Sequence, residues 1–414
     1  MAHPASAISA PRPRSLRWPV VGLLSIGVII AYIDRINLSF ALPDMSKSMA
    51  LSAVDSGRLL SAFFWSYAAL QVPAGWLVDR YGVKWPYTFS FLFWSLISAA
   101  TALVKSLPQL LVVRVLLGIG EAIVTPGSLC YIRSHFAEKQ RGLAIGIYMA
   151  GTKFGPGIGG PIAAYLVANY GWQGMFAITG LGFLPWLIPW LLLVGNDRPG
   201  AAARPAAGEQ PTLSWRAILS SPVLWGTFLA TFCYMYFVYF CMTWMPIYFQ
   251  QRHNLTLTGS GWFTFMSFGG MATIAILAGL AADRLIAGGR NPVTVRKAFT
   301  IAGFLLASTQ IVGAISSSIP VTLFFAVFSL SGLGLTMPNY WALTQTLMPG
   351  AAIGRVAGMQ NMAANIAGIV SPWLTGWIIQ QTGRFEAPIV AIAFWLALGI
   401  GCYVFLVREK YAPR

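Results

Sequence analysis

The sequence predicts an all-α membrane protein with twelve transmembrane helices, arranged as two pseudo-symmetric bundles of six. Charged residues make up only 9% of the 414 residues, whereas a soluble domain carries about 25%. Apolar runs of roughly 20 residues, the length that crosses the hydrocarbon layer, recur twelve times along the chain. One long polar segment, residues 196–221, divides these runs into six and six.

Each predicted helix is an apolar run bounded by a polar or charged loop. The first six lie near 18–42, 57–78, 86–104, 109–132, 142–168 and 173–195. The other six lie near 222–249, 259–282, 297–316, 319–347, 356–380 and 386–407. The chain therefore divides into an N-terminal arm at 1–17, a first bundle at 18–195, a central loop at 196–221, a second bundle at 222–407 and a tail at 408–414.

The loop charges predict how the chain is oriented in a bacterial inner membrane. Loops on the N-terminal side hold 19 of the 27 lysines and arginines, and loops on the other side hold five. Short loops rich in these residues stay in the cytoplasm. We therefore expect a multi-pass protein, in contact with lipid, whose two termini and central loop are cytoplasmic.

Several function classes are disfavoured by the motifs that the sequence lacks. The four cysteines lie in apolar runs without CxxC spacing, and the three histidines lie outside the runs, so neither a metal site nor a histidine relay is expected. No nucleophile–base pattern and no G-x-x-x-x-G-K-[ST] phosphate loop occurs. The net charge of +16 is spread through short loops. We expect no enzyme, no metal, no bound cofactor and no nucleic-acid partner.

Five ionisable side chains lie inside the predicted spans, all in the first half: Asp34, Arg35, Arg114, Glu121 and Lys153. A charge at the bilayer centre costs about 2.5–3.5 kcal/mol on insertion scales. These groups must therefore pair with one another, or face water or a substrate. One interpretation is a structural ion network that holds two spans together. The other, which we favour, is a site for an anion and for protons.

Helix geometry places four of these charges near one another. At 1.5 Å per residue, Asp34 lies about 13 Å and Arg114 about 9 Å from the outer ends of their spans. Asp34, Arg35 and Arg114 thus share one level. Glu121 follows Arg114 by two helical turns and lies on the same face, about 10 Å deeper. Asp34 and Arg35 point about 100° apart and cannot simply pair with each other.

The chemistry of these residue types suits proton-linked anion binding. The guanidinium of arginine is a planar fork that matches a carboxylate. A buried carboxylate near an arginine experiences opposed effects, because desolvation favours its neutral form and the cation its charged form. Such a group can exchange a proton near neutral pH, which is what coupling of transport to protons requires.

The two halves echo each other in a short motif. "GWLVDRYGVK" follows the second span, and a fainter copy, "GLAADRL", follows the eighth. The first resembles the G-x-L-x-D-R-x-G-x-x signature of the major facilitator superfamily, and twelve spans split six and six agree with that fold. The resemblance implies that these residues stabilise one conformation of a transporter that works by alternating access. They are Gly75, Asp79, Arg80, Gly82, Lys84, Asp283 and Arg284.

A narrower resemblance concerns "YIDRINLSFALP" at 32–43 and "RVLLGIGEAIVTPG" at 114–127. Both resemble the anion:cation symporter branch of the superfamily, which includes bacterial proton symporters for galactonate, glucarate and hexuronates as well as phthalate-type permeases. The resemblance implies that Asp34 and Glu121 are the proton-linked acids. It also implies that Arg35 binds the substrate carboxylate and that Arg114 is a partner of the acids.

Further residues are candidates for lining the substrate site. Tyr32 and Tyr67 match cavity-lining positions of the family, with interior packing as the alternative. Asn361 and Asn365 lie on one helical face and are able to bond a substrate hydroxyl or a neighbouring helix. Lys153 is interpreted as a ligand for a second anionic group or a partner of Asp34 or Glu121, or else as a snorkelling lysine or one that tethers helices. The remaining candidates, for stacking or hydroxyl contacts, are Trp341, Tyr236 and Tyr239.

Together these patterns predict a monomeric secondary transporter that takes up a small organic anion, a sugar acid or other carboxylate, with the proton as coupling ion. An alternative is a proton-coupled drug or metabolite efflux antiporter, because "GTKFGPGIGG" at 151–160 fits a string associated with such antiporters. Small residues at that spacing also let helices pack closely. A receptor or sensor is disfavoured because the longest polar segment is too short for a signalling domain.

Overall fold

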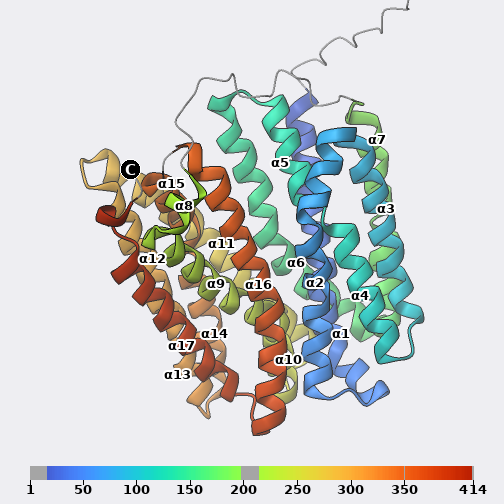
Figure 1. The fold of residues 1–414 in the computed structure, drawn as a ribbon. Coiled ribbons are helices and arrows are strands. Elements are labelled where there is room, and N and C mark those ends of the chain that lie inside the picture. Colours follow the sequence, from blue (N-terminus) through green and yellow to red (C-terminus); the bar gives the residue numbers. More distant parts are fainter. Residues whose placement is uncertain (1–15, 197–213, 349, 413–414) are drawn as a thin grey trace, which may run out of the picture.

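The computed structural model describes residues 16–196, 214–348 and 350–412. Long helices lie side by side between two faces of the molecule, and no strand occurs in the described ranges (Figure 1). The first helix, α1 (Arg17–Met49), begins at the face where the last long helix of the chain ends (Figure 1). We call this face the terminal face and the other the opposite face.

The first bundle runs from α1 to α7. After α1 its helices are α2 Ala53–Tyr81, α3 Lys84–Ala100 with the 3-10 helix η2 Thr101–Leu103, α4 Leu107–Glu121, α5 Val124–His135, α6 Glu138–Gly182, the 3-10 helix η3 Leu184–Trp186, and α7 Leu187–Leu193. A short helix, α8 (Trp215–Leu219), precedes the second bundle.

The second bundle runs from α9 to the C-terminal end. Its helices are α9 Pro222–Thr243, α10 Met245–His253, α11 Leu257–Ala287, α12 Pro292–Ser308, α13 Gln310–Ile315, α14 Ile319–Leu333, α15 Thr336–Leu347, α16 Gly350–Thr382, α17 Ala387–Gly401, the π-helix η5 Cys402–Leu406 and the 3-10 helix η6 Glu409–Tyr411.

Ten stretches of the described chain are long and apolar enough to cross a membrane. One of them, Gln140–Leu193, has 54 residues and makes two crossings, because the chain reverses at Gly171. The 29-residue helix α2 is a further crossing outside the ten. These stretches account for twelve crossings, so the predicted all-α membrane fold is confirmed.

The reversal at Gly171 turns one long apolar stretch into a helical hairpin. Gly171 has φ 68°, a backbone conformation that residues with a side chain rarely adopt. Beyond it, the Asn37 Nδ2 donates to the Thr179 hydroxyl at 3.1 Å, and the Trp186 indole donates to the carbonyl of Leu23 at 3.1 Å. The contacting residue in α1 comes earlier in the chain as the residue in this segment comes later, so the segment runs antiparallel to α1.

Three predicted spans are each broken into two helices by a proline. The breaks lie between α4 and α5, α9 and α10, and α14 and α15, just before Pro126, Pro246 and Pro338. Proline cannot donate to the carbonyl four residues earlier, and this carbonyl is then free for other bonds. Pro246 thus frees the Met242 carbonyl, which accepts a hydrogen bond from the Ser39 hydroxyl of the other bundle at 3.1 Å.

The two bundles repeat a packing contact. A Cβ atom built on Gly75, near the end of α2, would lie 3.9 Å from the Pro126 side chain. One built on Gly279, near the end of α11, would lie 3.6 Å from the Pro338 side chain. The motif glycine and its faint copy therefore pack against equivalent prolines, which supports the internal symmetry that the sequence indicated.

Close contacts between the bundles lie toward the opposite face, where α2 begins and α16 ends. A Cβ on Gly376 would overlap the Ala53 backbone, and one on Gly57 would lie 2.7 Å from the Pro372 carbonyl oxygen. The Phe64 ring lies 4.6 Å from that of Tyr239. These glycines let the backbones of α2 and α16 touch directly, so the bundles are closed against each other on this side.

Candidate functional site

The centre of the candidate site is a buried ion pair between α1 and α4. The Arg35 Nε lies 2.8 Å from the Glu121 Oε2, and the two side chains are 4% and 0% exposed. Glu121 is the last residue of α4, directly before the break in the predicted span. The pair joins two helices that are far apart in sequence. It is compatible both with a structural ion network and with a site for an anion and protons.

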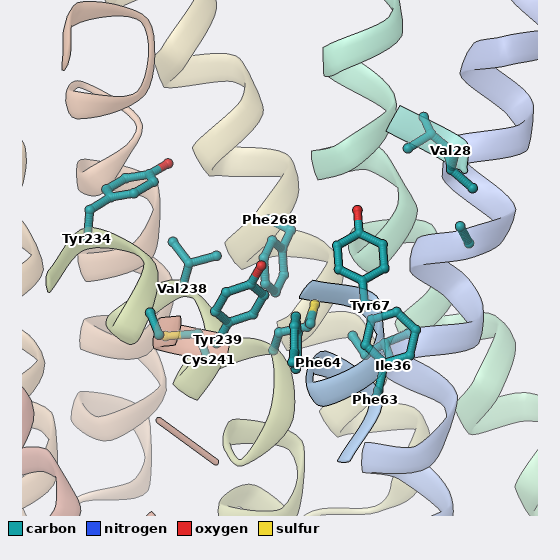
Figure 2. Packing of buried hydrophobic residues seen from close by; sticks show 14 of the residues in the cluster. Val28, Ile36, Phe63, Phe64, Tyr67, Tyr234, Val238, Tyr239, Cys241 and Phe268 are labelled. Carbon is teal, nitrogen blue, oxygen red and sulfur yellow. The ribbon is translucent and has the colours of Figure 1, made fainter. Parts of the chain in front are cut away.

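Aromatic rings surround the guanidinium of Arg35. Its Cζ lies 4.5 Å from the ring centroid of Tyr32, 4.7 Å from that of Phe63 and 4.6 Å from that of Tyr67. Phe63 and Tyr67 stack on each other and stand side by side in Figure 2. A desolvated cation over an aromatic face is stabilised by about 2 kcal/mol. The rings therefore hold the cation and fix its plane.

Arg35 uses few of its donors. Its Nε donates to Glu121, and neither Nη1 nor Nη2 forms an ion pair with a carboxylate in the described ranges. The Tyr32 hydroxyl also lies within hydrogen-bonding reach of the guanidinium. These two nitrogens form one edge of the planar fork that matches a carboxylate. Arg35 is thus held in place by Glu121 and three rings, while the edge formed by Nη1 and Nη2 pairs with no carboxylate of the described chain.

Arg114 lies in the same cluster without a direct ionic partner. Its Nε donates to the Leu59 carbonyl oxygen at 3.4 Å, and its Nη1 is sealed from solvent with no partner among the described residues. It is within electrostatic range of Glu121, Arg35 and Asp34. Arg114, implied by the resemblance to be a partner of the acids, therefore acts on them at a distance.

Asp34 points to a different neighbour, as the angle between adjacent helical residues requires. It is 1% exposed and accepts a hydrogen bond from the Ser98 hydroxyl of α3 at 2.9 Å. No lysine or arginine of the described chain forms an ion pair with it. Asp34 and Glu121 are close enough to influence each other electrostatically, so protonation of one bears on the other.

The second bundle contributes tyrosines to this cluster. Tyr239 of α9 is 7% exposed and lies within electrostatic range of Arg35, Tyr32 and Tyr67. Figure 2 shows the hydroxyl groups of Tyr239 and Tyr67 on the side of their rings that faces Val28, toward the terminal face. Tyr239 therefore lies close to Arg35 from the other bundle.

Other predicted aromatic residues are arranged differently. Tyr236 packs against Trp395 of α17, with ring centroids 5.6 Å apart, and is not among the groups within electrostatic range of Arg35. Trp341 is half-buried beside Tyr340. Tyr340 and Tyr234, which were not predicted, are buried and lie within electrostatic range of Tyr32 across the bundle boundary.

The two predicted asparagines of α16 interact with each other. The Asn365 Nδ2 donates to the Asn361 carbonyl oxygen at 3.0 Å. Asn365 is 5% exposed and Asn361 is exposed. The structure does not bond either amide to the charged cluster. The Asn361 side chain has no hydrogen-bond partner among the described residues, so its amide is available to a ligand.

Lys153 lies apart from the other four charges. It is 6% exposed, and no hydrogen bond or ion pair joins it to a described residue. No charged side chain of the described chain lies within its electrostatic range. The tether to Asp34 or Glu121 that the sequence left open is therefore not formed.

The motif residues lie away from this cluster, at the terminal face. Asp79 lies 3.8 Å from the Arg133 guanidinium, and Asp283 lies 3.2 Å from that of Arg296. The Lys84 Nζ donates to a backbone carbonyl of α7 at 2.9 Å. These contacts join neighbouring helix ends.

Three further motif residues differ in their surroundings. Gly82 ends α2 with φ 79°, a conformation that favours glycine. The Arg80 guanidinium lies about 6 Å from the Trp76 and Tyr81 rings. Arg284 is exposed.

Comparison with known proteins agrees with this arrangement. Residues 24–372 match the model of the Major Facilitator Superfamily. The chain is 28% identical to a probable galactarate/D-glucarate transporter of Escherichia coli, covering 95% of each chain. It is 30% identical to a probable L-galactonate transporter of the same organism, over 96% of this chain and 91% of the relative. A hexuronate transporter of Bacillus subtilis is 29% identical, over 95% and 94%.

Solved structures show the same fold at low sequence identity. A bacterial homologue of the human lysosomal transporter Spinster, in an inward-facing and unoccupied conformation, superposes with a TM-score of 0.83. It is 17% identical, with 97% of this chain and 99% of that chain covered. A D-xylose-proton symporter gives a TM-score of 0.77 at 15% identity, with 94% and 97% covered.

Proposed function

The chain belongs to the Major Facilitator Superfamily, and on that premise we propose that it takes up a sugar acid or a similar small carboxylate together with protons. It is a multi-pass membrane transporter rather than an enzyme. The observation that carries the proposal is the Nη1–Nη2 edge of the Arg35 guanidinium, which pairs with no carboxylate of the described chain. The guanidinium itself is fixed by three rings and held at Nε by Glu121. The relatives that match nearly the whole chain are named as sugar-acid transporters, which supports the proposed substrate class.

In the proposed cycle, the substrate carboxylate replaces the acids as the partner of the arginines when the acids are protonated. When Glu121 and Asp34 are protonated, Arg35 and Arg114 lack a compensating charge, and the carboxylate of the substrate supplies it. When the substrate leaves, the acids release their protons and compensate the arginines again. Binding of protons and of substrate strengthen each other by the same factor, because the coupling of two sites is reciprocal.

The packing of the bundles supports exchange of substrate on one side. The close contacts between α2 and α16 lie toward the opposite face. Phe64 packs against Tyr239 (Figure 2), which is within electrostatic range of Arg35. We assign the terminal face to the cytoplasm of a bacterial inner membrane, since most loop lysines and arginines lie there. On this assignment the structure is the state that is closed to the outside. We propose a monomer, because each chain holds a complete cluster.

The efflux alternative rests on the string at 151–160, for which the structure offers a packing reason. Cβ atoms built on Gly151 and Gly155 would lie 2.6 Å from the Val28 side chain and 2.5 Å from the Tyr32 side chain. Small residues at these positions therefore let α6 lie directly on α1. Because close packing explains these small residues, the 151–160 sequence does not favour antiport over symport. The buried arginines favour an anionic substrate.

Transport by the reconstituted full-length protein tests the proposal. Liposomes with an alkaline interior are expected to accumulate radiolabelled D-galactonate or galactarate above the external concentration. A protonophore is expected to abolish accumulation, and other carboxylates are expected to compete. Extrusion of cationic drugs against a proton gradient, with no uptake of any carboxylate, would contradict the proposal and favour the efflux alternative.

A further inference from the structure

Lys153 is a buried cation in α6 that has no partner in the described chain. It lies 15 residues after the first residue of α6, so its Cα is about 22 Å along the helix. This is too deep for its ammonium to reach the terminal face. A charge at such depth costs at least about 2.5 kcal/mol if it is not compensated. The fold gains no visible contact in return.

The face of α6 that carries Lys153 is directed at the second bundle. Lys153, Gly157 and Gly160 follow one another at four and three residues, so they share one helical face. A Cβ on Gly157 would lie 3.6 Å from the Phe268 side chain, and one on Gly160 would lie 2.9 Å from the Thr264 side chain. Phe268 and Thr264 both belong to α11, so Lys153 also faces the boundary between the bundles.

The residues across this boundary cannot compensate the ammonium. Gly160 meets Thr264 and Gly157 meets Phe268, so α6 and α11 run antiparallel, and one more turn brings Lys153 opposite Met271 and Ala272. Both are buried and apolar. The boundary between the bundles is also where transporters built from two repeats hold their substrate. An anionic group of the substrate is therefore the natural partner of Lys153.

The packing of α6 on α1 places Lys153 relative to the charged cluster. Gly151 lies beside Val28 and Gly155 beside Tyr32, so Lys153 lies at the level of residue 30. Arg35 is five residues farther along α1, which is about 7.5 Å nearer the opposite face. The Cα atoms of the two cations are thus separated along the bundle axis, and Lys153 lies outside the electrostatic range of every charged side chain of the described chain, Arg35 included.

We propose that Lys153 binds the second carboxylate of a substrate whose first carboxylate is bound by Arg35. The protein then selects short-chain sugar diacids over the corresponding mono-acids. This inference rests on the proposed function, since it names the class of sugar acid that the same site takes. The hydroxyl groups of Tyr67 and Tyr239 lie on the terminal-face side of their rings (Figure 2), toward the level of Lys153, and are suited to bond hydroxyls of the substrate between its two ends.

Galactarate and D-galactonate form a matched pair of probes, because they differ only in whether carbon 6 is a carboxylate or a hydroxymethyl group. We expect the purified protein to bind galactarate more tightly in calorimetric titrations. Lys153→Gln is expected to weaken galactarate binding at least about tenfold, the usual effect of leaving one member of a buried charge pair alone. It should change D-galactonate binding by less than about twofold, and Lys153→Arg should retain the preference for the diacid.

A stability measurement guards against a variant that merely misfolds. Because Lys153 has no partner without ligand, Lys153→Met is expected to raise the melting temperature of the ligand-free protein. Equal weakening of both acids by Lys153→Gln, or no weakening of either, would overturn the inference while leaving the proposed function intact. Failure of the unmodified protein to bind any sugar acid would overturn both.

Discussion

Replacing Arg35 with lysine is expected to weaken binding of a sugar acid at least about 100-fold, although the positive charge is retained. Lysine has neither the planar fork nor the flat surface that stacks on rings. The exchange therefore removes the Nη1–Nη2 edge that we assign to the substrate carboxylate, as well as the contacts with Tyr32, Phe63 and Tyr67. Titration of the purified variant with D-galactonate, which offers one carboxylate, measures the loss.

Arg58→Lys is the matched control for this substitution. Arg58 belongs to α2 of the same bundle, is half-exposed and forms a surface pair with Asp55 at 3.6 Å. Such surface pairs contribute about 0–1 kcal/mol, so this variant is expected to bind the substrate normally. If Arg35→Lys bound D-galactonate as tightly as the unmodified protein, the guanidinium would not be the carboxylate ligand.

Replacing Glu121 with glutamine is expected to separate substrate movement from proton movement. Glutamine keeps the shape of the side chain and an oxygen near the Arg35 Nε, but it cannot gain or lose a proton. Counterflow of labelled against unlabelled sugar acid should therefore persist in liposomes. Accumulation driven by a proton gradient should fall to the level of equilibration, because the substrate no longer competes with a titrating acid for Arg35.

Glu386→Gln provides the same chemical change at an exposed arginine–glutamate pair. Glu386 bonds the Arg252 Nε at 2.6 Å on the opposite face, outside the charged cluster. This variant is expected to accumulate substrate like the unmodified protein. Glu121→Ala is less informative, because an unpaired buried arginine costs about 3–5 kcal/mol of stability. Gradient-driven accumulation by Glu121→Gln would remove Glu121 from the proton-coupling role.

Much of the fold followed from the sequence because the bilayer constrains both length and composition. Apolar runs marked the crossings, whereas most of the predicted central loop at 196–221 lies outside the described residues. The hairpin at Gly171 was located as two spans, 142–168 and 173–195, although the structure joins them without a polar loop. The helix breaks before Pro126, Pro246 and Pro338 fall inside single predicted spans, since the loss of one hydrogen bond does not determine how far a helix opens.

The candidate site was less predictable, because pairing between helices depends on the reach of side chains. The five charged residues were identified from their apolar surroundings. Helix geometry placed Asp34, Arg35 and Arg114 at one level. It did not reveal that the Arg35 side chain pairs with Glu121 while the Arg114 side chain donates to a backbone carbonyl.

Residues without an unusual sequence signal were missed. Ser98, which donates to Asp34, and Phe63, which stacks on Arg35, are ordinary members of apolar runs. Tyr340 is the neighbour of the predicted Trp341 and carries no distinguishing signal in the sequence. Only the packing of the helices distinguishes such residues from the many serines and aromatic residues that face lipid or a neighbouring helix.

Proton uptake on substrate binding tests the central claim most directly. Purified protein in weakly buffered detergent solution is mixed with D-galactonate, and the pH is followed with an indicator dye. We predict that the unmodified protein takes up protons as it binds, so that the pH rises in proportion to the sites filled. The double variant Asp34→Asn, Glu121→Gln should bind without this change. Saturable binding to the unmodified protein without proton uptake, at neutral and at mildly alkaline pH, would contradict the exchange of protons for an anion.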